Sequence, residues 1–284
     1  MTEGVSGHLK RRRFLRILGS TAATVLATGG VAEALLEPHR LRVFRYRLDV
    51  PALPAAFDGL RIAQLTDVHH GPYIGLDEVE QAVALANAER PDLIALTGDY
   101  CYRSWRFIEP CHQVLAGLQA PLGCFGVLGN HDHWASATRS RRAMAAAGIA
   151  ELTNTNCCLK CKGDRLWICG VGDLWADEQL LPQALAGVPE DGCAVLLSHN
   201  PDYNEHVTDP RVRLVLAGHT HGGQVNLPLI GAPILPSSYG SKYRAGIIRT
   251  GGRLVFVSRG IGVISPPIRF RCPPEVSLLT LHCA

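Results

Sequence analysis

Five apolar segments of the chain constrain its fold more than any other feature, because each is followed within three residues by an aspartate, asparagine or histidine. The segments are LRIAQLT, DLIAL, CFGVL, CAVLL and VRLVLA. Short apolar runs of this kind are typical of the buried strands of a parallel sheet. The stretches between them favour helices at residues 77–89, 107–118, 135–147 and 178–186. Alternation of strands and helices predicts an α/β fold.

The remaining segments predict further strands around this pattern. Residues 41–50, LRVFRYRLDV, alternate apolar and basic side chains, which indicates a half-exposed strand. A hairpin is expected around the turn Lys162-Gly163-Asp164, and RLVFVS and EVSLLTL predict two strands near the end of the chain. Because no repeat or low-complexity linker divides the sequence, we expect one domain over residues 35–284.

The polar residues behind the five segments should lie close together. In open α/β sheets, ligands bind in the crevice at the carboxyl ends of the strands. Residues two apart at a strand end, as in Asp67-x-His69 and His219-x-His221, project to the same side. The side chains expected around this crevice are Asp67, His69, Asp99, Asn130, His131, Asp132, His199, His219 and His221.

The residue types in this set indicate a metal centre. Carboxylate, amide and imidazole ligands without thiolates suit hard or borderline divalent ions such as Mn²⁺, Fe²⁺ or Zn²⁺. The set is too large for one tetrahedral ion, and it suits two divalent ions that share a carboxylate, as in two-metal phosphatases. Glycines directly precede Asp99, Asn130 and His219, where they permit tight turns and a close approach of backbones.

The order of these blocks resembles the calcineurin-like metallophosphoesterase superfamily over residues 41–282. The blocks are Asp67-Val68-His69, Gly98-Asp99, Gly129-Asn130-His131-Asp132, His199 and Gly218-His219-Thr220-His221. The resemblance implies two packed mixed β-sheets flanked by helices, with a dimetal site at the carboxyl ends of the strands. It also implies hydrolysis of phosphodiester or pyrophosphate bonds by a metal-bridging hydroxide.

The resemblance also implies a role for each site residue. The first metal ion would be held by Asp67, His69 and His221, and the second by Asn130, His199 and His219. Asp99 would bridge the two ions. His131 would donate a hydrogen bond or a proton toward the leaving group, and Asp132 would help to orient its loop.

The N-terminal residues 1–34 indicate a targeting segment. Arg11-Arg12-Arg13-Phe14-Leu15-Arg16 resembles the twin-arginine export signal, and an uncharged stretch at 17–32 precedes an A-x-A-like site at Ala32-Glu33-Ala34. The alternative is a basic membrane-surface anchor that is not removed. The signal, HNPD (His199–Asp202), GHTHGGQ (218–224) and the tail IGVISPPIRFRCPPE together resemble an exported bacterial phosphodiesterase branch. We therefore expect the twin-arginine machinery as a partner and a location beyond the cytoplasmic membrane.

The charge and hydropathy of the chain narrow the range of substrates that we expect. Residues 35–284 carry 23 basic and 23 acidic side chains, which removes the bulk electrostatic case for nucleic acid. The apolar, proline-rich segment Val225–Pro236 directly follows the last histidine motif and is either a plain buried loop or an apolar wall that faces lipid. The second alternative predicts a lipid-linked phosphoester and contact with a membrane surface.

Several alternatives remain open from the residues alone. The chain could be a broad phosphomonoesterase or a non-catalytic metal-binding module, and Tyr102 in Gly98-Asp99-x-x-Tyr also fits the purple acid phosphatase pattern. The cluster Cys157-Cys158-x-x-Cys161 could hold zinc, although small apolar residues on strands are the simpler interpretation. The flanking His70 and His133 are expected to be solvated or hydrogen-bonded neighbours, and Asp173 an outer partner of the site. Trp134 is expected to pack in the core, with contact to the substrate as the alternative.

Overall fold

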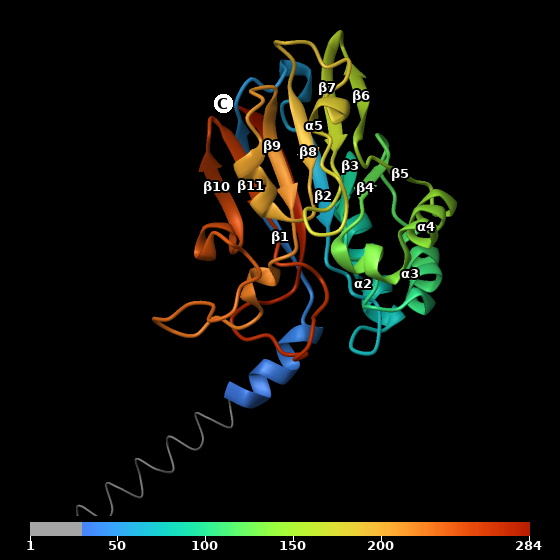
Figure 1. Cartoon of the computed structure of the whole chain (residues 1–284), viewed down its shortest axis with the longest axis vertical. Coiled ribbons are helices and arrows are strands. Elements are labelled where there is room, and N and C mark those ends of the chain that lie inside the picture. Colours follow the sequence, from blue (N-terminus) through green and yellow to red (C-terminus); the bar gives the residue numbers. More distant parts are fainter. Residues whose placement is uncertain (1–29) are drawn as a thin grey trace, which may run out of the picture.

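The computed structural model describes residues 30–284, which form two six-stranded sheets packed face to face (Figure 1). The first sheet has the order β1 (Arg42–Val50), β12 (Glu275–Cys283), β2 (Arg61–Leu65), β3 (Leu93–Thr97), β4 (Cys124–Val127) and β5 (Ile149–Glu151). The second has the order β10 (Gly246–Thr250), β11 (Arg253–Val257), β9 (Val212–Ala217), β8 (Ala194–Leu197), β7 (Asp164–Gly170) and β6 (Thr155–Cys161). The predicted fold of two mixed sheets flanked by helices is therefore confirmed.

Parallel pairing dominates the centre of each sheet. Strands β2, β3, β4 and β5 are parallel neighbours, and so are β7, β8, β9 and β11. Antiparallel pairs join β12 to β2, β10 to β11, and β6 to β7. The five apolar segments of the sequence are β2, β3, β4, β8 and β9, and almost all their residues are buried because they are covered on both faces.

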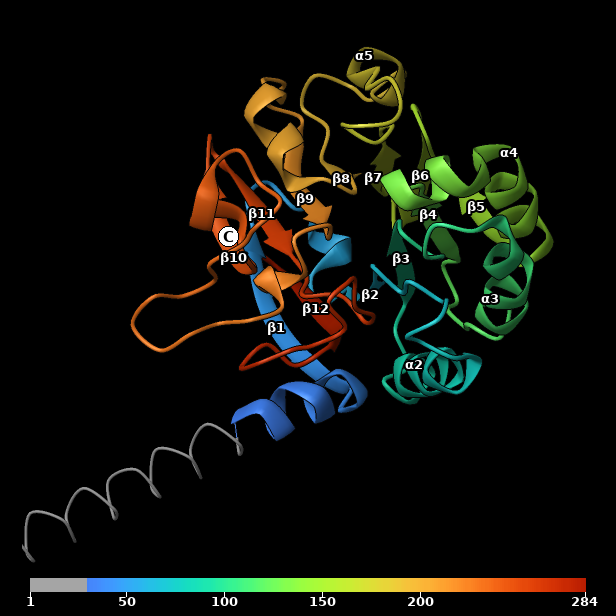
Figure 2. The ribbon, with the colours of Figure 1, turned by 60° about the horizontal axis from the view of Figure 1, so that its bottom comes forward.

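The main core lies between the two sheets. Side chains such as Ile62, Leu93, Val195, Leu214 and Phe256 pack together there. A second apolar cluster joins the outer face of the first sheet to the helices α2 (Leu76–Ala88), α3 (Ile108–Leu115) and α4 (Asn130–Ala146). The outer face of the second sheet is covered by α5 (Leu181–Ala184) and the 3-10 helix Pro201–His206. Figure 2 shows these layers.

The helix boundaries differ from the expected ones at one position that matters for the site. The Ala-rich helix was expected at 135–147, but α4 begins at Asn130, and the Asp132 side chain accepts a hydrogen bond from the backbone N–H of Gly129. The motif Asn130-His131-Asp132 is therefore the first turn of a helix and not a loop. The backbone leaves helical geometry at Ser136, which separates this turn from the rest of α4. The expected helix 178–186 is reduced to Leu181–Ala184.

Residues 30–36 are helical and rest against the domain. The backbone N–H of Arg269 donates to the carbonyl of Ala34, and the carboxylate of Glu37 accepts from the N–H groups of Arg271 and Cys272. The A-x-A-like site thus falls within this helix. The twin-arginine motif lies outside the described residues, so the boundary at residue 34 stays a prediction.

Within residues 30–284, none of the helices combines the length and the apolar character that a membrane crossing requires.

The ten cysteines are free thiols in the described part of the chain, where no disulfide joins them. Cys157, Cys158 and Cys161 lie on β6, and Cys157 and Cys161 pack against the main core. Successive side chains of a strand point to opposite faces, so Cys158 points away from the other two. The groups of residues between 30 and 284 that could hold a metal ion contain no cysteine.

Candidate metal centre

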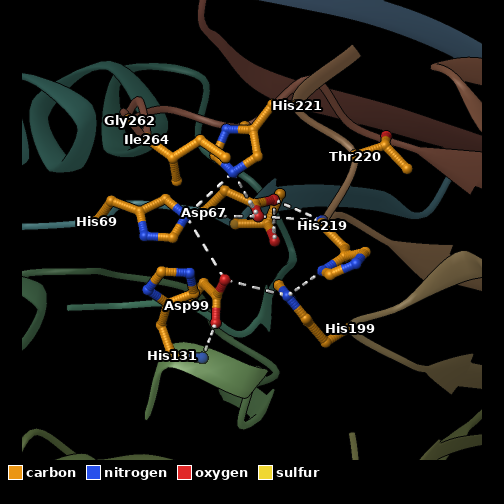
Figure 3. Close-up of polar contacts among 12 residues, drawn as sticks. Asp67, His69, Asp99, His131, His199, His219, Thr220, His221, Gly262 and Ile264 are labelled. Carbon is orange, nitrogen blue, oxygen red and sulfur yellow. Dashed lines mark hydrogen bonds and ion pairs between the residues drawn. The ribbon is translucent and has the colours of Figure 1, made fainter. Parts of the chain in front are cut away.

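The carboxyl ends of the strands bring the expected histidines and aspartates into one buried cluster (Figure 3). Three overlapping groups place their nitrogen and oxygen atoms within 4.8 Å of one another, at the separation that a bound ion requires. The groups are Asp67, His69 and His221; His69, Asp99 and His131; and Asp99, His199 and His219. Six of these seven residues are ligands that the sequence predicted for the two ions. The seventh is His131, which was expected beside the ions, and the predicted ligand Asn130 is not in these groups.

Asp99 lies between the two halves of the cluster. Its Oδ2 is 3.5 Å from Nε2 of His69 and 3.2 Å from Nε2 of His199. In the first half, Oδ1 of Asp67 is 3.3 Å from Nε2 of His221. In the second, Nδ1 of His219 is 3.2 Å from Nε2 of His199. A carboxylate that faces ligands on both sides has the geometry expected of a bridge between two ions.

The residues present fit a metal pair. The side-chain oxygen of Asn130 is buried and makes no hydrogen bond within the protein, although a buried polar group normally has a partner. The rings of His69 and His221 face each other with their Nε2 atoms 3.0 Å apart. Two imidazole nitrogens directed at one point, beside a buried carboxylate, are the arrangement that a cation stabilises.

Burial sets the protonation of most of these histidines. Burial lowers the pKa of His69 and of His219 to about 3, and it lowers the pKa of His221 well below its ordinary value. These three rings are therefore neutral, as metal ligation requires. Burial would also lower the pKa of His199, but the carboxylates of Asp99, Asp67 and Asp173 outweigh it and raise that pKa.

The backbone of the ligand loops is strained. Asp67, His69, Asp99, His219 and His221 all have positive φ, between 48° and 69°. A residue with a side chain is destabilised by roughly 1–3 kcal/mol in this backbone conformation, and residues strained in this way gather at functional sites. Glycines allow the same loops to approach closely. A Cβ at Gly218 would lie 2.2 Å from Oδ2 of Asp67, and a Cβ at Gly129 would lie 2.3 Å from Oδ1 of Asp99.

Asp132 lies beneath the cluster and orients it. The side chain is fully buried, and its carboxylate accepts hydrogen bonds from the N–H groups of Asp99, Tyr100 and Gly129 at 2.7–2.9 Å. The N–H of His131 in turn donates to Oδ1 of Asp99 at 2.8 Å. Asp132 therefore acts on the site through the backbone of Asp99, which corresponds to the orienting role expected from the sequence.

His131 lies at the rim of the cluster between aromatic neighbours. Its ring stacks on Tyr102 with centroids 5.3 Å apart and meets Trp134 at 4.9 Å. The ring of His69 lies at 4.7 Å. The position of His131, 7% exposed and next to Asp99, suits a group that reaches toward a leaving oxygen. Tyr102 packs against the rings of His69 and His131. The tyrosine that the purple acid phosphatase alternative requires therefore lies next to the cluster.

The flanking residues lie outside the ligand groups. Nδ1 of His70 bonds the carbonyl of Ile74, and Nε2 of His133 lies 3.5 Å from the carboxylate of Asp177. Both histidines are therefore neighbours of the metal centre and not members of its ligand groups, as expected. Asp173 follows β7 and is buried, and burial raises its pKa. Trp134 is 55% exposed, so the expectation that it packs in the core is wrong.

Two features of the site are not marked by any metal-ligand motif. Trp175 is 53% exposed and its ring meets the ring of His219 edge to face at 4.3 Å. The loop after β11 packs on the first ligand loop, because the N–H groups of Ile261 and Gly262 donate to the carbonyls of Thr66 and Asp67. Arg269 is fully buried and donates to the carbonyls of Arg259, Gly260, Gly262 and Cys272. No metal-ligand spacing marks this loop or its arginine.

Adding Mn²⁺ to the metal-stripped protein is expected to raise Tm by about 5–10 °C. An ion at a hundredfold excess over its Kd contributes roughly 2.7 kcal/mol, and roughly 2–4 °C corresponds to each kcal/mol in a domain of this size. Thermal unfolding followed by circular dichroism measures the shift. The variant His219→Ala/His221→Ala should lose most of it. An equal rise in the variant would place the stabilising ion elsewhere.

Comparison with known proteins agrees with this geometry. The profile of the calcineurin-like phosphoesterase family matches residues 60–223. The chain is 33% identical to the uncharacterized metallophosphoesterase YkuE of Bacillus subtilis, over 96% of this chain and 98% of that protein. It is also 33% identical to the phosphodiesterase YaeI of Escherichia coli, over 96% and 99% of the two chains.

A third relative is more distant. The UDP-2,3-diacylglucosamine pyrophosphatase LpxG of Chlamydia trachomatis is 28% identical over 86% of this chain and 90% of that protein. The family profile covers more than half of the chain and includes every residue of the metal cluster. The chain therefore belongs to the calcineurin-like phosphoesterase family.

Proposed function

We propose that the protein is a dimetal phosphoesterase that hydrolyses phosphodiester or pyrophosphate bonds. The observation that carries the proposal is the pair of buried ligand groups that meet at Asp99, with His131 at their rim. A bound pair of divalent ions would activate water and neutralise charge on the phosphoryl oxygens. A non-catalytic module on this fold would have no need for the histidine at the rim. We therefore rank the metal-binding module below the enzyme.

The residues around the ions would each contribute a separate function. Asp67, His69 and His221 would hold one ion and Asn130, His199 and His219 the other, with Asp99 between them. His131 would donate a hydrogen bond or a proton to the departing oxygen, since its ring lies at the open edge of the cluster. Asp132 would hold Asp99 and His131 in position relative to each other through its hydrogen bonds with the backbone.

A substrate with substituents on both sides of the phosphorus is favoured over a monoester. Trp134 and Trp175 are both about half exposed, and they adjoin His131 and His219 at the two halves of the cluster. A diester could place one substituent against each ring, whereas a monoester could use only one of them. The relatives named phosphodiesterase and pyrophosphatase favour the same class.

The full-length protein, stripped and reloaded with Mn²⁺, is expected to hydrolyse bis-p-nitrophenyl phosphate with a kcat/KM at least about tenfold above that for p-nitrophenyl phosphate, a difference of roughly 1.4 kcal/mol in transition-state binding. Release of nitrophenol with and without the metal measures both rates. A preference for the monoester would instead identify a phosphomonoesterase. Bound metal without cleavage of either compound would support a binding module.

A membrane surface is the proposed setting of the reaction. Leu229 is fully exposed, Ile230 and Ile234 are 72% and 79% exposed, and helical residues 30–36 expose Val31 and Leu35. The loop and the helix lie on the side of the molecule to which the central strands point (Figures 1 and 2). Exposed apolar side chains gathered on one side mark an interaction surface. A cavity of about 620 Å³ beside the loop is lined by Arg244 and Arg271, which suits anionic headgroups.

Export by the twin-arginine route would place this surface on the outer side of the cytoplasmic membrane. The motif Arg11-Arg12-Arg13-Phe14-Leu15-Arg16 supports this proposal. The double substitution Arg11→Lys/Arg12→Lys is expected to retain at least about nine tenths of the protein in the cytoplasm, because the export receptor recognises the arginine pair. Cell fractionation with immunoblotting measures the distribution. Unchanged distribution would favour the alternative of a basic membrane-surface anchor.

A further inference from the structure

An apolar cavity of about 270 Å³ opens next to the metal centre. Thr220 and the ligand His221 are among the residues that line it. The apolar residues that line the rest are Val225, Pro233, Ile234, Pro236, Ile264, Pro266 and Ile268. Its volume lies near the lower end of the roughly 300–1,000 Å³ typical of ligand pockets.

The cavity adjoins the reaction centre directly. His221 contributes its Nε2 to the cluster, 3.3 Å from Asp67, and the same residue lines the cavity. Figure 3 shows Ile264, another lining residue, beside the rings of His221 and His69. A phosphoryl group held by ions at this cluster would therefore have one ester substituent at the mouth of the cavity.

The walls are held in place by hydrogen bonds. Oε1 of Gln224 accepts from the N–H of Ile264 at 2.7 Å, and its Nε2 donates to the carbonyl of Pro266 at 3.2 Å. The N–H of Asn226 donates to the carbonyl of Phe270, and the N–H of Phe270 donates to the carbonyl of Gln224. These bonds join the segments 224–226 and 264–270, so the protein itself holds this part of the lining in place.

The chemistry of the lining selects an apolar occupant. His221 is the only titratable residue in the lining, and its ring nitrogen is directed into the metal cluster. The hydroxyl of Thr220 donates to the carbonyl of Arg244, the amide of Gln224 is used by the walls, and Ser265, which also lines the cavity, is exposed at the surface. A sugar or nucleoside here would leave hydroxyl groups unpaired, which costs roughly 1–3 kcal/mol for each group. A hydrocarbon chain loses no such bonds.

We propose that this cavity is a subsite for a hydrocarbon chain carried by the phosphoester substrate. The proposal rests on the proposed function, because the chain is attached to the phosphoryl group at the metal centre. It defines the substrate class as an amphiphilic phosphoester, with its apolar substituent packed between the segments 225–236 and 264–268. Each methylene buried in the cavity contributes to binding, up to the length that the cavity holds.

Binding of methyl-, butyl- and octylphosphonate to the full-length, Mn²⁺-loaded protein tests the subsite. Calorimetry is expected to show Kd falling by about fourfold for each added methylene, since roughly 0.8 kcal/mol is gained on burying one. The heat-capacity change of binding should become more negative with chain length. A Kd that does not depend on chain length would overturn the proposal.

Comparison of the variant Ile234→Asp with the control Leu229→Asp distinguishes binding in the cavity from binding to the exposed apolar surface. Both residues are exposed in the same apolar segment, but only Ile234 lines the cavity. Ile234→Asp is expected to weaken octylphosphonate binding at least about tenfold, or roughly 1.4 kcal/mol, and to leave methylphosphonate binding unchanged. Leu229→Asp should match the wild type. Equal losses in both variants would assign the effect to the exposed surface and overturn the subsite.

Hydrolysis of p-nitrophenyl butyl and octyl phosphates, each below its micellar concentration, distinguishes the two proposals. A higher kcat/KM for the octyl ester, lost in Ile234→Asp, would support the subsite. Equal cleavage of both esters would overturn the subsite and keep the diesterase function. Cleavage of neither ester, with chain-length-dependent phosphonate binding intact, would overturn the diesterase function and keep the subsite.

Discussion

His131→Ala is expected to lower kcat/KM for a phosphodiester by about 10²–10⁴-fold, the range that general acid catalysis contributes. The ring lies at the rim of the cluster, while its backbone N–H, which alanine retains, donates to Asp99. The variant should therefore keep its fold and its metals. Steady-state kinetics, together with metal analysis of the same preparation, measures both quantities.

His133→Ala provides the matched control for this experiment. His133 lies two residues further along α4 and contacts Asp177 and not the cluster. Its replacement should change the rate by less than about threefold, since it touches no reacting group. A leaving group of lower pKa should also suffer less from the loss of His131, because it needs less protonation. A rate for His131→Ala within threefold of wild type would remove the assigned role.

Arg269→Met is expected to lower the free energy of unfolding by about 3–5 kcal/mol and Tm by about 10 °C. The guanidinium is fully buried and donates to four carbonyls, three of them in the loop that packs on Asp67. Methionine fills much of the volume but leaves those carbonyls unpaired. Because that loop supports the first ligand group, the affinity for metal should fall by about 10–100-fold.

Arg271→Met is the matched control for the buried arginine. Arg271 lies two residues further on and its side chain is exposed, so the substitution should change Tm by less than about 2 °C. Denaturant titration and calorimetric metal binding measure the two effects. Equal stability of the two variants would show that the loop carbonyls accept hydrogen bonds from other groups when Arg269 is replaced.

The sequence was sufficient to predict the architecture and the members of the cluster. Strands that are buried on both faces are recognisable as short, continuous apolar runs. Because parallel strands end at a common edge, the residues that follow β2, β3, β4, β8 and β9 were expected to converge. The start of α4 was placed five residues too late, because Asn130, His131 and Asp132 are poor helix formers. Their side chains instead bind backbone groups and neighbours at the first helical turn.

Tertiary structure alone decided how the cluster is supported. The positive φ angles of Asp67, Asp99 and His219 are not the local preference of residues with a side chain, and the N–H groups of all three donate to distant segments. Arg269, Trp175 and the apolar cavity beside His221 likewise depend on loops that meet in space after long separations in the chain. By itself the sequence determined which ligands meet at one edge. Long-range packing determined their geometry, because each strained loop is held by groups that no local pattern contains.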